Sequence, residues 1–245
     1  MTLQDSSAGR GVGVGPRTAA LVVTLFVVNA AWNVSLNTLL ARTGLASSLG
    51  TTYLTVPLTG LGAVGGLTAA TVAGVAVLTA LVRSFAPEAD ALGAGETPIE
   101  TVLVYARAVV VAVGGVVAAG LGLAALVVPG LVVLVHLPLV FVAVAADGDP
   151  IGRAVDRTWK RARGNRARIA AVGLAVAAVP LALVVVATLT TLLSPVVELA
   201  VGVVVTGATA AAGAAAFTAI SESIGESSTG ASRSDRVNAT ASGRL

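Results

Sequence analysis

Apolar residues occur along this chain in six long runs, and short polar segments separate them. Each run is close to or above the roughly 20 residues that a helix needs to cross the hydrocarbon core of a bilayer, when tilt and short spans are allowed for. The pattern therefore predicts an all-α fold: a polytopic transmembrane helical bundle of about six spans. The expected spans are residues 18–41, 58–82, 104–127, 130–146, 169–192 and 197–219.

Polar, glycine- or serine-rich segments lie at both ends of the chain. Such segments cannot bury enough apolar surface to offset the entropy of ordering. We expect residues 1–17 and 221–245 to be disordered tails that flank one membrane domain, 18–220. Within that domain, Pro129-Gly130 predicts a tight turn between the third and fourth spans, so that these two spans form an antiparallel hairpin.

A short basic segment, 150–164, follows the fourth span and predicts an amphipathic helix. Asp149 suits the N-cap and Pro150 the first helical position, while Gly164-Asn165 is a stop signal. At 100° per residue, one apolar arc and one basic arc result. The apolar arc holds Ile151, Val155, Thr158, Trp159 and Ala162, and the basic arc holds Arg153, Asp156, Arg157, Lys160, Arg161 and Arg163.

An amphipathic helix with a tryptophan opposite its cations is typical of a membrane interface. Arg166 and Arg168 then begin the fifth span at the expected level of the lipid headgroups. We therefore expect these two arginines, the five cations of the basic arc and Trp159 to contact anionic lipid headgroups.

Composition supports a membrane location, because 56% of the residues are hydrophobic and only 11% are charged. Soluble domains average about 25% charged residues. A pI near 10.2 could indicate nucleic acid binding. The cations gather beside apolar runs, however, which favours membrane lipids as partners, with a membrane protein or a second copy as a further possibility and no nucleic acid.

The distribution of cations predicts the orientation. Of the fifteen Lys and Arg residues, only Arg42 falls on the outer side of the six-span topology. Short cytoplasmic loops carry an excess of Lys and Arg. We expect a multi-pass protein of the cell membrane with both termini in the cytoplasm. Arg10, Arg17 and the Val28-Asn29-Ala30 triplet would also fit a cleaved secretory signal, which would leave the orientation downstream unchanged.

Polar residues inside the spans raise two alternatives. Asn29, Asn33 and Asn37 recur every four residues, so they share one helical face. They could line a substrate path, or they could hydrogen-bond to neighbouring helices and hold the bundle together. His136, in the fourth span, could relay protons or bind a metal, but it has no second His, Cys or carboxylate in its span, which favours a structural hydrogen bond.

Small residues also recur every four positions in the second span, at Gly62, Gly66, Ala70 and Gly74. This pattern lets another helix approach closely.

Catalytic chemistry has little support in the sequence. The chain has no Cys, and the four carboxylates of the polar segment 83–100 have no histidine partner or metal-ligand spacing. We assign no catalytic residue, cofactor or metal. The expected function is that of a non-enzymatic membrane protein that organises lipid or a membrane partner; the alternative is a small-solute or lipid transporter or channel.

The region 128–169 resembles the membrane domain attached to some glycerophosphoryl diester phosphodiesterases and its stand-alone, YciC-like relatives. That resemblance implies the six-span layout but no catalysis, because no soluble phosphodiesterase domain is present. The chain departs from the family pattern by having Thr158 in place of a serine and His136 where many members have an arginine. Its single Lys among many Arg is typical of GC-rich genomes such as those of haloarchaea. The matching residues are Pro129, Gly130, Gly148, Pro150, Ala154, Trp159, Arg163, Gly164 and Asn165.

Overall fold

The computed structural model describes residues 15–43, 54–86, 97–125, 127–189 and 194–242, and all of its regular elements are helices. Five of these helices are long and apolar enough to cross a membrane. The chain is therefore a membrane protein with several apolar helices, as its hydropathy pattern predicted. The helices are α1 (Pro16–Arg42), α3 (Gly60–Phe85), α5 (Pro98–Ala125), α6 (Val127–Asp147), α7 (Ile151–Ala162), α8 (Arg166–Leu189) and α9 (Pro195–Ser242).

The five candidate spans are α1, α3, α5, α6 and the part of α9 from Leu199 to Ile224. The remaining expected span, 169–192, begins on α8, and its last three residues lie outside the described part of the chain. The expected tail 1–17 also falls largely outside the described residues, except that Pro16 and Arg17 already belong to α1.

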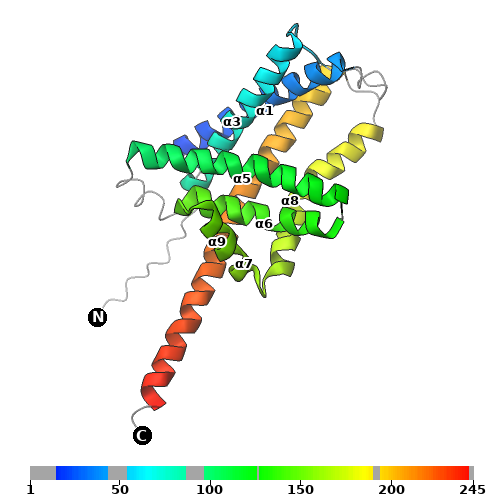
Figure 1. Ribbon diagram of the computed structural model, residues 1–245. Helices are drawn as coiled ribbons and strands as arrows, with labels where there is room; N and C mark the ends of the chain where they lie inside the picture. The colour runs from blue at the N-terminus through cyan, green and yellow to red at the C-terminus, as the bar shows by residue number, and fades with distance from the viewer. Residues whose placement is uncertain (1–14, 44–53, 87–96, 126, 190–193, 243–245) are drawn as a thin grey trace, which may run out of the picture.

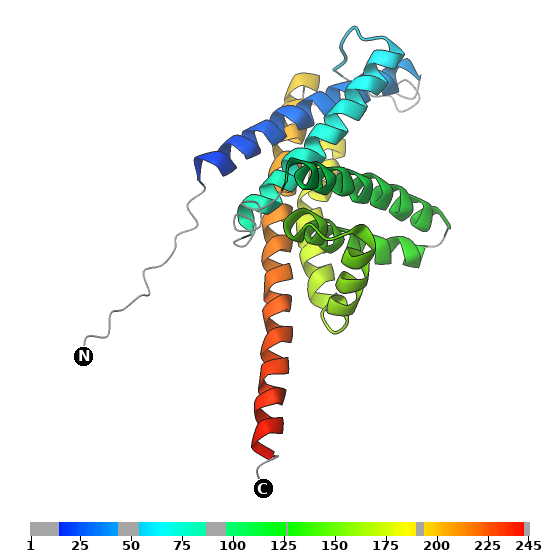
Figure 2. The same ribbon diagram turned by 60° about the vertical axis from the view of Figure 1, so that its left-hand side comes forward.

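Helix α6 is the centre of the molecule. In its apolar window 44% of the residues are buried, against 11–17% in the other four candidate spans. Two groups of buried side chains both include residues of α6. One joins α6 to the end of α3, to α8 and to α9, with Phe217 and Ile220 as its bulky members. The other joins α6 to α3, α5 and the start of α7 around Val144. Figures 1 and 2 show the α5–α6 pair lying crosswise to the long α9.

The α5–α6 hairpin was predicted correctly, but its turn was placed too late. Helix α6 already begins at Val127, so Pro129 and Gly130 lie in its first turn. A proline is tolerated there because the first N–H groups of a helix have no intrahelical partner. Gly130 instead allows the backbones of α5 and α6 to approach closely. A Cβ added to Gly130 would come within 2.4 Å of the Leu123 backbone nitrogen, and a Cβ added to Gly122 would come within 2.8 Å of Gly130.

Small residues also bring α1 and α3 together. A Cβ on Gly66 would lie 2.7 Å from the Ser35 hydroxyl, and one on Gly74 would lie 3.5 Å from Val28. The Trp32 indole donates a hydrogen bond of 3.1 Å to Thr71 across the same contact. Two members of the small-residue pattern, Gly66 and Gly74, therefore mark a helix–helix contact, as expected, whereas Gly62 faces Thr59 and Leu58 just before its own helix.

The polar segment after residue 220 differs from the prediction. It continues α9 as far as Ser242 instead of forming a disordered tail. The physical reason is local: the chain has no proline after Pro195, and a helix that has already nucleated gains a backbone hydrogen bond for each residue added.

Candidate functional site

The basic helix α7 is bounded by two glycines in the left-handed region. Gly148, with φ +66°, turns the chain out of α6, and Gly164, with φ +89°, separates α7 from α8. The prediction of a stop at Gly164 is confirmed. The predicted N-cap is wrong: the cap residue is Pro150, which makes no side-chain cap, and its carbonyl accepts from the Ala154 N–H at 2.9 Å.

Helix α7 packs against α6 through small side chains. Ala154, Thr158 and Ala162, spaced four residues apart, are buried. Val155 and Trp159 point outward, with 46% and 40% of their surface exposed. The apolar arc predicted from sequence is thus divided: its small members lie against the bundle, and these two large members lie on the outside.

Asp149 has a different role, because it forms part of an ion-paired turn. It is only 5% exposed. The Arg157 guanidinium lies 3.1 Å from its Oδ2 and also pairs with Asp147 at the end of α6. From α5, Arg107 donates a hydrogen bond of 3.2 Å to the Gly148 carbonyl. Two arginines from two helices therefore hold the turn between α6 and α7.

These pairs change the set of cations that can reach lipid. Arg157 is occupied by the turn, and Lys160 pairs with Asp156 at 2.7 Å on the helix surface. Within the described part of the chain, four of the other five predicted headgroup ligands have no carboxylate partner. The fifth, Arg161, lines a small cavity together with Asp147, and its charge interacts with that carboxylate. The four are exposed, and Arg161 is half-buried. These four are Arg153, Arg163, Arg166 and Arg168.

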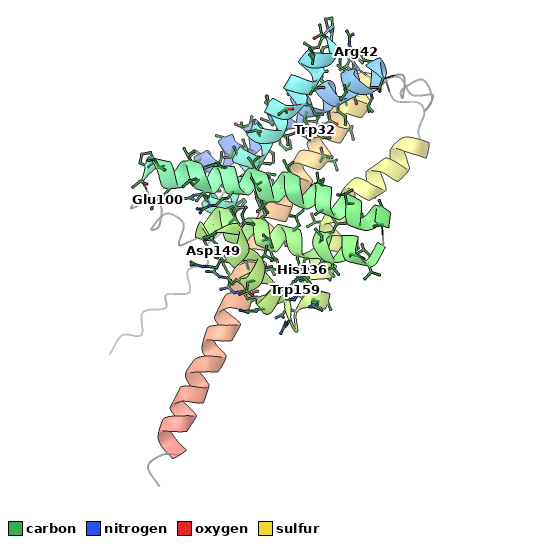
Figure 3. All side chains as sticks on the ribbon, in the orientation of Figure 1. Trp32, Arg42, Glu100, His136, Asp149 and Trp159 are labelled. Carbon is green, nitrogen blue, oxygen red and sulfur yellow. The ribbon has the colours of Figure 1, made fainter. Side chains whose placement is uncertain are left out.

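His136 and Trp159 meet although they come from different helices. Their rings stack with centroids 4.6 Å apart and an interplanar angle of 27°, as Figure 3 allows the reader to follow. The Arg166 guanidinium lies over the Trp159 ring, 5.5 Å from its centroid. His136 is 8% exposed; its Nδ1 lies 2.8 Å from the Val132 carbonyl oxygen, whereas its buried Nε2 has no partner among the described residues.

The asparagines of α1 form hydrogen bonds of two kinds, one to a neighbouring helix and one within α1. The Asn29 amide donates to the Val203 carbonyl of α9 at 3.1 Å and to the Thr206 hydroxyl. Asn33 donates back along α1 to the Asn29 carbonyl and side chain, at 2.8 and 3.1 Å. Asn37, like the other two, is half-buried. At Asn29, the structure has the interhelical hydrogen bond that the bundle-holding alternative requires.

A small cavity lies between α6, α7 and α9. Its volume is about 20 Å³, which is room for one water molecule. Its polar lining comes from Asp147, Thr158, Arg161 and Ser221. The three asparagines do not line it, so this cavity is not the aqueous path that a transporter would need along α1.

Sequence reasoning missed the contacts that join α7 to the bundle. The Asp-Gly-Asp-Pro motif at 147–150 indicates a turn. From the sequence alone, however, an aspartate directly before a proline indicates a helix N-cap, and the burial that gives Asp149 a different role is seen only in the structure. The partners of Arg107 and His136 lie 41 and 23 positions away in the chain. No periodicity reports such distant contacts.

The described residues contain no group of three or more His, Cys, Asp or Glu side chains that could hold a metal ion. Comparison of the chain with protein-family models, curated proteins and solved structures finds no match.

Proposed function

We propose that this chain is a non-enzymatic, multi-pass protein of the cell membrane whose basic end, α7 with the first turn of α8, binds anionic lipid headgroups and so organises lipid or a membrane partner. The observation that carries the proposal is the set of four exposed arginines at this end that have no carboxylate partner among the described residues, together with the exposed ring of Trp159. These four are Arg153, Arg163, Arg166 and Arg168. Because Arg157 and Lys160 are paired with carboxylates, this set of arginines is the charge that we propose faces the lipid headgroups.

The magnitudes favour lipid contact. Each cation near an anionic membrane surface contributes about 1 kcal/mol, falling off within a Debye length. The four exposed arginines together would attract an anionic surface by several times the thermal energy. Salt would weaken this attraction, whereas burial of the Trp159 ring would persist.

The orientation that we propose puts this basic end and both termini in the cytoplasm, with α8 as the sixth span. The cation count supports it, since Arg42 is the one cation assigned to the outer side. Figure 3 shows Arg42 at the far end of the molecule from Asp149 and Trp159.

We also propose membership of the membrane-domain family of glycerophosphoryl diester phosphodiesterases and their stand-alone relatives. Its support is the motif that ends in Arg163-Gly164-Asn165, together with the turn at Gly148. In this chain the motif residues build the α5–α6 contact, the α6–α7 turn and the α7–α8 turn, which are structural roles. The proposal of a non-enzymatic role agrees with that use.

The test is the lipid shell of the purified protein. The four arginines, Arg153, Arg163, Arg166 and Arg168, are changed to Gln, and native nanodiscs from cells are analysed for lipid composition. The control changes an equal number of arginines elsewhere: Arg42, Arg233, Arg236 and Arg244. We expect the anionic enrichment around the protein to fall in the first variant and to persist in the control. Equal enrichment in both variants would contradict the proposal.

The transporter alternative has weaker support. A polar path along α1 needs asparagine side chains that face water, whereas Asn29 directs its two amide hydrogens to α9. Solute flux into proteoliposomes, compared between the natural chain and Asn33→Leu, measures this alternative directly.

A further inference from the structure

We propose that His136, Trp159 and Arg166 form a binding site for the headgroup of one anionic phospholipid that carries free hydroxyl groups. This inference rests on the proposed function, because it requires the basic end to face the membrane surface. It adds that one headgroup is recognised by its chemistry, and not only by its charge.

The first support is the hydrogen-bonding state of His136. A carbonyl oxygen can only accept, so the Nδ1 that lies 2.8 Å from the Val132 carbonyl must carry the hydrogen. In the neutral ring, Nε2 then bears a lone pair, and it is buried with no partner among the described residues. Buried polar groups are nearly always hydrogen-bonded. The missing partner is therefore a hydrogen-bond donor from outside the described chain.

The second support is the position of this nitrogen. Counted along the fourth span, His136 would lie near the middle of the membrane, 11 residues before Asp147. Helix α7, however, folds back along α6, and Trp159 stacks on the imidazole. His136 consequently lies beside the basic helix, and Trp159 lies between it and the first residue of α8. If α7 is at the membrane surface, the unpaired nitrogen is also close to the headgroups.

The third support is a place for a phosphate beside it. Arg166 is exposed, has no carboxylate partner in the described part of the chain, and lies over Trp159. It is also the first residue of α8, where Asn165 acts as the cap and its carbonyl accepts from the Ile169 N–H. The N–H groups of residues 166–168 precede the first intrahelical bond. Phosphate binds well to such helix starts and to guanidinium groups.

The surrounding charge identifies the donor. Arg161, Arg163 and Arg168 lie within a few residues of the site, so an ammonium headgroup would meet repulsion from like charges. A neutral hydroxyl can donate to Nε2 without that repulsion. A phosphodiester with hydroxyls, of the glycerol or inositol kind, supplies both the anion for Arg166 and the donor for His136.

Trp159 forms one side of the site. It stacks on the imidazole yet is 40% exposed. The Nε2 lone pair lies in the plane of the imidazole, so a hydroxyl that donates to it approaches beside the stacked indole. Binding should therefore change the environment of Trp159.

The experiment compares two lipids with the same charge. The full chain is placed in nanodiscs of phosphatidylcholine containing either phosphatidylglycerol or phosphatidylmethanol, which has the same single negative charge but no hydroxyl. Bound lipid is counted by native mass spectrometry, and Trp159 fluorescence is followed in a Trp32→Phe background. We expect about a fivefold preference for phosphatidylglycerol, which corresponds to about 1 kcal/mol.

Two variants test the assignment of residues. His136→Phe keeps an aromatic ring under Trp159 but removes Nε2, and it should abolish the preference while both anionic lipids still bind. Arg166→Gln should weaken the binding of both lipids more than Arg163→Gln does, since Arg163 is also exposed but does not lie over Trp159. Because Arg166 and Arg163 are both exposed, this second comparison does not depend on the folding of the His136 variant.

The outcomes separate the two proposals. If phosphatidylcholine alone binds as well as either anionic lipid, the proposed function fails. If both anionic lipids bind equally, or if His136→Phe keeps the preference, the headgroup site is wrong and the proposed function stands. If soluble glycerol phosphate saturates the detergent-solubilised protein at the concentration that the lipid requires, the ligand is a free phosphoester, and the assignment to lipid is overturned.

Discussion

Removal of the Arg157 guanidinium, by the substitution Arg157→Met, should destabilise the bundle at the α6–α7 turn. The change would leave Asp149 as a carboxylate at a position where its side chain is 7% exposed. Breaking a buried ion pair by removing one partner costs about 3–5 kcal/mol. The arginine side chain itself is 33% exposed, so solvent screening lowers that figure. The second partner, Asp147, has a side chain that is 43% exposed and contributes little.

We therefore expect a loss of about 2–3 kcal/mol, nearly all of it from the Asp149 pair. Thermal unfolding of the detergent-solubilised protein measures this loss, and the midpoint should fall by roughly 5–10 °C. Lys160→Met is the matched control, because both members of its pair are more than 60% exposed, so its effect should be small. The double variant Arg157→Met with Asp149→Asn should recover part of the stability, since no buried charge remains.

Equal effects of Arg157→Met and Lys160→Met would refute the reasoning. The reasoning would also be refuted if Asp149→Asn made the Arg157→Met variant less stable. In that case the loss of stability in Arg157→Met would not come from the unpaired charge of Asp149.

Two further predictions concern helix contacts. Gly66→Ala should weaken the α1–α3 contact by about 1–3 kcal/mol, because its new Cβ would come within 2.7 Å of the Ser35 hydroxyl. Gly65→Ala, next to it, has open space and should be neutral or slightly stabilising; thermal unfolding of the two variants shows the difference. Asn29→Leu should loosen α1 from α9 by about 1 kcal/mol, measured as faster amide hydrogen exchange in α1. Unchanged exchange would show that this hydrogen bond does not hold the helix.

The sequence by itself determined the class of protein and the order of its elements. Hydropathy over about 20 residues depends only on local composition, so the apolar helices could be located from it, although not all of their ends could. Gly148 and Gly164 bound α7 because positive φ angles favour glycine, whatever surrounds them. The small residues at Gly66 and Gly74 likewise mark the contact with α1 in advance.

Helix ends were harder to predict where one sequence feature favours a turn or a tail and another allows the helix to continue. Pro129-Gly130 is a turn signal in isolation, yet it fits the first turn of α6, where proline loses no hydrogen bond. The segment after residue 220 has the composition of a tail, but it follows a nucleated helix and continues it to Ser242.

Only the tertiary structure decided how α7 is rolled about its axis and which cations remain available. A hydrophobic arc specifies a face, but not whether that face meets protein or lipid. The close packing of Ala154 and Thr158 on α6 resolves this, and it carries Trp159 onto His136. The same docking brings Arg157 to a buried Asp149. These outcomes depend on how α7 packs against α6, which the spacing of residues along a single helix does not specify.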